Sequence, residues 1–145
     1  MARILDGAAF AAAIKQEVAE EVGELAALGV RPGLAAVLVG HVAASEIYVR
    51  SKVQACAELG LFSDLITPAA DVSTEAMLDL VAALNARDDI DGILIQLPLP
   101  PQIDSKRLLD AIDPAKDVDG FHPRECRATA CRPSRACALY ARRRN

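Results

Sequence analysis

The sequence predicts an α/β domain in which helices flank a mainly parallel sheet. Short apolar runs alternate along the chain with segments of helical length, an order typical of layered α/β domains. The first run, residues 34–39, is apolar without interruption, as in a strand buried on both faces of a parallel sheet. With 145 residues, 52% of them hydrophobic and 25% charged, the chain has the size and composition of one globular domain.

The first half of the chain contains two predicted helices around one strand. The first helix spans residues 7–28, with Asp6 as its N-cap and Gly29 as its stop. Its apolar positions step at three and four, so we expect one buried stripe, formed by Phe10, Ile14, Val18, Val22 and Leu25. The strand at 34–39 follows. The second helix spans residues 44–59 and ends at Gly60.

The second half repeats this alternation. Residues 61–67 form a strand of weaker pattern, and Ser73 or Thr74 opens a helix in capping-box style that runs to about residue 86. The apolar run at 93–97 is a third strand, and residues 105–112 form a short helix that Asp113 and Pro114 end. Residues 116–121 are expected to be a loop or the entry to a strand.

Charge is distributed unevenly along the chain. Seven Arg and one Glu give residues 124–145 a formal charge of +6, which leaves −10 on residues 1–123 within the net charge of −4. An acidic body does not favour nucleic-acid binding. Since no window has the roughly 20 apolar residues of a membrane helix and the N-terminus lacks a signal-peptide pattern, we expect a cytoplasmic protein that does not bind membranes.

The composition changes sharply after Pro123. We expect residues 1–123 to form the domain and residues 124–145, which are rich in Arg and Cys, to be an unstructured tail produced by a frameshift. A zinc site formed by His122, Cys126, Cys131 and Cys137 is an alternative, but the spacing lacks a C-x-x-C pair, and we expect no metal site. Cys56 lies in the body, where a buried thiol in a reducing compartment is the simplest interpretation.

Several polar side chains are expected near the carboxyl ends of the strands, where open α/β sheets bind ligands. Tyr48 and Lys52 are four residues apart and therefore share one side of a helix, and Ser45 lies one turn earlier. Gln96 is a polar residue in an apolar strand, so its amide needs a partner, and Lys52 is the candidate. A lysine beside apolar and neutral groups becomes a usable acid/base, and a tyrosine ring offers a flat surface to an aromatic ligand.

Asp119 follows the third strand and has the chemistry to accept two hydrogen bonds from the amidine-like edge of a heterocycle. Taken alone, each of these features has a simpler interpretation. Tyr48 and Lys52 are typical of an exposed helical pair, and the charged residues Lys116, Asp117 and Asp119 are typical of a solvated loop.

Three segments together resemble the bifunctional tetrahydrofolate dehydrogenase/cyclohydrolase family. They are Val39-Gly40 with Ser45-x-x-Tyr48-Val49-x-x-Lys52, then residues 91–100 (DGILIQLPLP), then Lys116-Asp117-Val118-Asp119-Gly120-Phe121. Their order and spacing are those of the family, and they cover most of residues 1–123. Between Gly40 and Ser45 the family usually has an acidic residue and a proline, where this chain has residues 41–44, HVAA.

The resemblance implies a role for each matching position. Lys52 would be the general acid/base, and Gln96 would assist and orient it. Tyr48 would stack on the folate and Asp119 would bind the pterin ring. Ser45, Ile95, Leu97 and Pro98 would complete the substrate site.

The resemblance also implies a reaction. Such enzymes oxidise 5,10-methylenetetrahydrofolate with NADP and hydrolyse the methenyl product to 10-formyltetrahydrofolate, and they are homodimers. The chain has no G-x-G-x-x-G turn, so we expect the NADP-binding Rossmann domain to be absent and the chain to be a truncated, largely inactive form.

Two other function classes compete with this interpretation. One is a non-catalytic module that binds folate or nothing, because hydride transfer needs a nicotinamide held against the substrate. The other is a short-chain dehydrogenase, in which Tyr and Lys are also four apart. That class needs a glycine-rich nucleotide turn after its first strand, which this sequence lacks.

Overall fold

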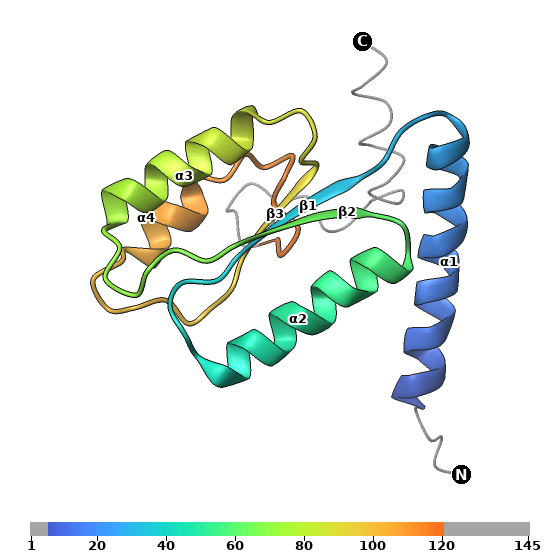
Figure 1. Ribbon diagram of the computed structural model, residues 1–145, viewed down its shortest axis with the longest axis horizontal. Coiled ribbons are helices and arrows are strands. Elements are labelled where there is room, and N and C mark those ends of the chain that lie inside the picture. The colour runs from blue at the N-terminus through green and yellow to red at the C-terminus, as the bar shows by residue number, and fades with distance from the viewer. Residues whose placement is uncertain (1–5, 121–145) are drawn as a thin grey trace.

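The computed structural model describes residues 6–120 as three parallel strands and four helices (Figure 1). Strands β1 (Gly33–Val37), β2 (Phe62–Ile66) and β3 (Gly92–Ile95) form a sheet in the order β2-β1-β3. Helices α2 (Ala43–Glu58) and α3 (Thr74–Ala86) make the crossovers between strands, preceded by α1 (Gly7–Ala27) and followed by α4 (Ser105–Asp110). The predicted α/β class and parallel sheet are confirmed.

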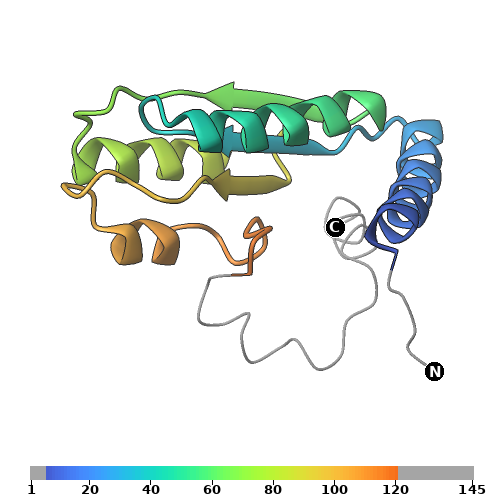
Figure 2. The same cartoon turned by 90° about the horizontal axis from the view of Figure 1, so that it is seen from below.

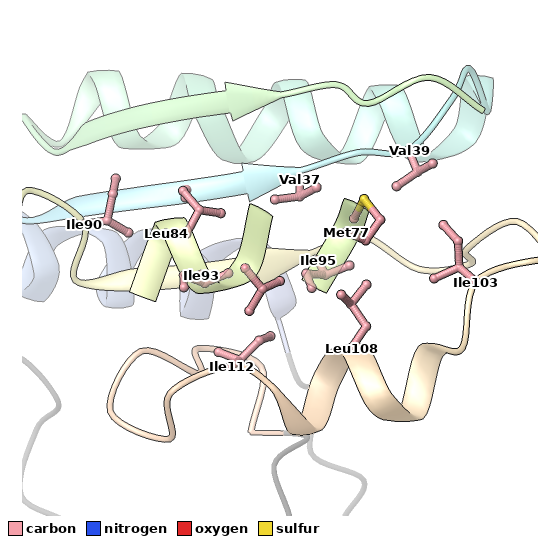
Figure 3. Close-up of a cluster of buried hydrophobic side chains, with 12 residues drawn as sticks. Val37, Val39, Met77, Leu84, Ile90, Ile93, Ile95, Ile103, Leu108 and Ile112 are labelled. Atoms are coloured by element: carbon pink, nitrogen blue, oxygen red, sulfur yellow. The ribbon is translucent and has the colours of Figure 1, made fainter. Parts of the chain in front are cut away.

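Helices cover both faces of the sheet (Figures 1 and 2). On one face, Val49 of α2 packs with Ala36, Leu38 and Leu94. On the other face, α3 and α4 cover the larger cluster, in which the side chains of Met77, Ile95 and Leu108 converge (Figure 3). Side chains of a strand point alternately to its two faces, so the alternation of Ile93, Leu94 and Ile95 between the two clusters defines which way each residue of β3 points.

The predicted helix ends are largely confirmed because they depend on local chemistry. The Asp6 carboxylate accepts hydrogen bonds from the amides of Ala8 and Ala9, at 3.0 and 3.1 Å, and the Ser73 hydroxyl accepts one from Ala76. Gly29 and Gly60 follow α1 and α2 with φ of +74° and +82°, a backbone region that glycine adopts without strain. Helix α4 ends at Asp110, two residues earlier than predicted.

The predicted buried stripe on α1 is wrong for its N-terminal half, whereas Val18 and Leu25 further along are half-buried. Val22 is its buried member, whereas Phe10 is 70% exposed and Ile14 is also exposed. Both views place α1 at the end of the molecule, beside the C-terminal end of α2 (Figures 1 and 2). Its periodicity therefore predicted a helix correctly, but little of the described chain covers its apolar face.

The segment that follows α4 returns to the sheet at the outer edge of β3. Ile93 forms a parallel bridge with Asp117, and its amide donates to the carbonyl of Lys116 at 2.7 Å. Of the two alternatives predicted for residues 116–121, the described part is a loop that pairs with β3 at Asp117 alone. The predicted domain boundary at Pro123, the tail at 124–145 and the alternative zinc site lie outside the described residues.

Candidate functional site at the carboxyl edge of the sheet

Helix α2 has two flanks with different surroundings. Its buried side, which includes Ser45, Val49 and Cys56, packs toward the sheet, and burial raises the pKa of the Cys56 thiol. Glu46 and Arg50 line a pocket of about 270 Å³ together with Leu65 and Thr67, so that flank faces β2. Tyr48 and Lys52 lie about 120–160° around the helix from Glu46 and Arg50. Since β3 is on the opposite side of β1 from β2, this second flank faces β3.

Tyr48 and Lys52 differ in exposure although they share a flank. The Tyr48 side chain is 67% exposed, so its ring is open to solvent, whereas Lys52 is half-buried one turn further along. A ring this exposed contributes little to folding and is available to stack on a planar ligand. The flank thus combines an open aromatic surface with a partly sheltered amine.

Gln96 lies immediately after β3 and not inside it. Its amide N–H still donates to the carbonyl of Val37 at 2.9 Å, which extends the ladder by one residue. Because Leu94 points to the α2 face, strand alternation directs Gln96 to that face as well. Its side-chain Nε2 donates to the carbonyl of Leu97 at 2.7 Å, so within residues 6–120 the side-chain amide is paired with the backbone and not with Lys52 as predicted.

Asp119 follows the segment that runs beside β3. Val118 packs in the α2-face cluster, and a Cβ added to Gly92 would lie 2.6 Å from Val118 Cγ1, so the Val118 side chain occupies the space that a side chain at residue 92 would need. Asp119 follows two residues after the Asp117 bridge to Ile93, in a turn that the Asp117 carboxylate closes at the edge of β3. The Asp119 side chain is exposed there.

The remaining predicted substrate-site residues occupy different environments. Ile95 is buried in the cluster beneath α3 and α4, so its side chain points away from the α2 face. Leu97 is half-buried and Pro98 is exposed, and the peptide bond between them is cis. The structure therefore places four of the predicted residues on the β3 side of the sheet, namely Tyr48, Lys52, Gln96 and Asp119. Ser45 is buried at the start of α2. The Ile95 side chain lies on the other face.

The opposite flank of α2 carries a charge cluster that the sequence did not predict. The Glu46 carboxylate lies 3.1 Å from His41 Nδ1 and 3.4 Å from Arg50 Nη2. His41 and Arg50 are largely exposed, so these pairs contribute little to stability. In the sequence, this cluster could have been recognised because Glu46 lies five residues after His41 and four residues before Arg50.

Lys116 and Asp117 differ from the solvated loop that their charges suggested. The Lys116 amine donates to the carbonyls of Leu84, Asn85 and Arg87 at the C-terminal end of α3, at 3.2, 2.8 and 2.6 Å. Cations stabilise this end of a helix because its last carbonyls lack partners within the helix. Asp117 is only 7% exposed. The sequence signal that could have identified it is a carboxylate followed three residues later by Gly120, which is typical of a side chain that closes a turn.

Comparison with known proteins identifies the family of these residues. Residues 5–119 match the family model described as tetrahydrofolate dehydrogenase/cyclohydrolase, catalytic domain. The chain belongs to this family. A short-chain dehydrogenase is therefore excluded as the family of these residues, and the predicted resemblance is confirmed.

Relatives show the same agreement in sequence and in fold. The bifunctional protein FolD of Koribacter versatilis is 62% identical over 123 residues, which are 85% of this chain and 40% of that protein. A 5,10-methylenetetrahydrofolate dehydrogenase structure from the silkworm Bombyx mori superposes with a TM-score of 0.82 at 42% identity, over 86% of this chain and 43% of that one. The Trypanosoma brucei FolD, solved with NADP and an inhibitor, gives a TM-score of 0.80 at 40% identity, over 84% and 42% of the two chains. The chain thus spans about 40% of the length of the relatives it matches.

NADP does not fit the turns that residues 6–120 provide. The turn from β1 into α2 has Gly40 alone, and Val42 occupies the N-cap of α2 without a side-chain hydrogen bond. A dinucleotide turn needs further glycines for close approach of the backbone to the pyrophosphate. Within the same residues, no helix has the length and apolar character needed to cross a bilayer.

Proposed function

We propose that this chain is the folate-binding, lysine-bearing catalytic part of a methylenetetrahydrofolate dehydrogenase/cyclohydrolase. The observation that supports this most directly is the flank of α2 that carries Tyr48 and Lys52 and faces the carboxyl end of β3. In this proposal the Tyr48 ring stacks on the folate, Asp119 accepts hydrogen bonds from the pterin, and Ser45, Leu97 and Pro98 line the site. Ile95 contributes through its backbone, because its side chain is in the core.

The hydrolytic step requires only water and the residues of this site. Water adds to the methenyl carbon between two nitrogens, and the Lys52 amine accepts its proton as the C–O bond forms. The bond from that carbon to N5 then breaks, Lys52 returns a proton to N5, and 10-formyltetrahydrofolate forms with one net proton released. In this proposal Gln96 orients the Lys52 amine with its side-chain carbonyl, while its Nε2 stays on the Leu97 carbonyl.

NADP takes no part in this hydrolytic step, and no turn within residues 6–120 fits its pyrophosphate. When bound elsewhere in a complete enzyme, NADP would supply the hydride acceptor for the oxidation of 5,10-methylenetetrahydrofolate. We therefore propose negligible dehydrogenase activity for these 145 residues alone. The homodimer that the resemblance implies and the cytoplasmic location predicted from the sequence belong to the same proposal.

A binding titration tests the proposal. The 145-residue chain is titrated with 5-formyltetrahydrofolate, a stable reduced folate, and with the variants Tyr48→Ala and Ile47→Ala. Ile47 is the matched control because its side chain is 69% exposed, close to the 67% of Tyr48, but it lies on another side of α2. We expect Tyr48→Ala to weaken binding about tenfold or more, as loss of one stacking contact does, and Ile47→Ala to change it less than about twofold.

Two results would contradict the proposal. One is a wild-type chain that does not bind the folate, which would favour a non-catalytic remnant that has lost its ligand. The other is equal weakening by Tyr48→Ala and Ile47→Ala, which would remove the Tyr48 flank from the site.

A further inference from the structure

The structure explains how a short exposed turn can hold Asp119 in one position. Asp119 and Gly120 lie at the end of the described chain, beyond the bridge that pairs Asp117 with β3. An exposed side chain on such a turn would sample many orientations unless its backbone were fixed. Fixing the group that contacts a ligand lowers the entropy lost on binding.

The Asp117 carboxylate supplies that constraint. Its Oδ1 accepts hydrogen bonds from the amides of Asp119, at 3.2 Å, and Gly120, at 3.0 Å. Gly120 has φ of +72°, which lets its N–H turn back toward the carboxylate. The 7% exposure of Asp117 strengthens both bonds because little water competes for the oxygen.

The base of the turn is held on two further sides. The amide of Ile93 binds the Lys116 carbonyl, and the Lys116 amine binds three carbonyls at the end of α3. Val118 packs against the α2-face cluster between these anchors. The backbone is therefore fixed through Val118, and Asp117 extends this order to Asp119.

We propose that Asp117 is a positioning residue for folate binding, which acts by holding the backbone of Asp119 and does not touch the ligand itself. The inference rests on the proposed function, in which Asp119 binds the pterin. Asp117→Ala removes the acceptor. Asp117→Asn keeps an oxygen that can accept the same two hydrogen bonds while removing the charge.

A double-mutant cycle on the 145-residue chain tests this, with 5-formyltetrahydrofolate as the probe. We expect Asp117→Ala to weaken binding about tenfold, consistent with the loss of one or two hydrogen bonds that order the turn, and Asp117→Asn to recover most of that affinity. In an Asp119→Ala background, Asp117→Ala should change binding less than about twofold, because its effect passes through Asp119. The control is Asp113→Ala, which removes a carboxylate that accepts from the amide of Ala115 in the same segment and should leave the affinity within about twofold of wild type.

Amide hydrogen exchange makes the test independent of folate binding. We expect the Asp119 and Gly120 amides to exchange at least about tenfold faster in Asp117→Ala than in wild type, with Asp117→Asn between them. Unchanged exchange, or an equal effect of Asp117→Ala on affinity with and without Asp119, would overturn the positioning role. Absence of folate binding by the wild type, or binding unaffected by Asp119→Ala, would instead refute the assigned ligand contact, and the exchange rates would still decide whether Asp117 orders the turn.

Discussion

Lys52 and Tyr48 share a flank of α2 because a separation of four residues is close to one helical turn. The sequence could predict that much, since it requires only that residues 43–58 be helical. Which flank faces β3 depends on how α2 crosses the sheet, and the pocket residues Glu46 and Arg50 identify the other flank. The role of Asp117 was not predicted, because a charged residue in a loop is usually solvated and its burial comes from the bridge to β3.

Replacing Lys52 should remove hydrolysis of 5,10-methenyltetrahydrofolate above the uncatalysed rate. Without the amine, no group on this flank accepts the proton of the attacking water, so we expect Lys52→Ala to lower the catalysed rate by about 10²-fold or more. The measurement is the loss of the methenyl absorbance with the purified chain. Arg50→Ala, which removes an equal charge from the opposite flank of α2, should keep the rate within about twofold, and a Lys52→Ala variant as fast as wild type would exclude the assigned role.

At the scale of elements, the helices differ in how much of their apolar surface the fold covers. Helix α3 buries Met77, Val81 and Leu84 against the sheet, as its periodicity predicts. Helix α1 has a comparable pattern, but it contacts the rest of the described chain mainly near Val22 and through the ion pair of Lys15 with Glu58, at 3.8 Å. A periodic pattern identifies a face that can be buried and does not specify the surface that covers it.

Arg87 connects β2 to the segment that precedes β3. Its guanidinium binds Asp64 of β2 and Asp89, which precedes β3. The hydrogen bond from Arg87 lowers the pKa of the Asp89 carboxyl below its ordinary 3.8. A carboxyl with a lowered pKa in the folded state stabilises the fold fully at a pH above its unfolded pKa. This stabilisation is lost as the pH falls through the folded pKa.

We therefore expect Asp89→Asn to lower the free energy of unfolding near neutral pH, and its difference from wild type to shrink as the pH falls below about 3.8. Urea titrations at a series of pH values measure this. Asp79→Asn, which changes an exposed carboxyl in the middle of α3, is the control and should change the free energy of unfolding little at neutral pH. A difference for Asp89→Asn that does not change with pH would contradict the role given to the Arg87 pair.

At the scale of the whole molecule, the two faces of the sheet contribute unequally. Among residues 6–120, the cluster under α3 and α4 contains twelve buried residues, against four under α2. Most of the burial that stabilises the fold is therefore on the face opposite the candidate site. The α2 face is left with a half-buried lysine, an exposed tyrosine and a glutamine whose amide binds the backbone, an arrangement better suited to ligand binding than to packing.

This asymmetry predicts very different costs for two truncations of large side chains. Leu108 is 0% exposed, so Leu108→Ala should lower the free energy of unfolding by about 2–5 kcal/mol through lost burial and a residual cavity. Phe10 on α1 is 70% exposed, so Phe10→Ala should cost less than about 0.5 kcal/mol. Denaturant titration of the two variants checks this, and similar costs would mean that the apolar face of α1 is covered in solution.

The sequence by itself determined the class of the sheet, the ends of most helices and the position of Tyr48 and Lys52 on one flank of α2. These features depend on contacts between residues close in the chain or on the apolar character of whole strands. Only the tertiary structure decided that Tyr48 and Lys52 face β3, that Ile95 points into the opposite core and that α1 leaves Phe10 exposed. The same holds for Asp117, which is buried and accepts a hydrogen bond from the amide of Asp119. Each of these depends on which distant segment lies alongside, and the periodicity of a single segment carries no information about its neighbour.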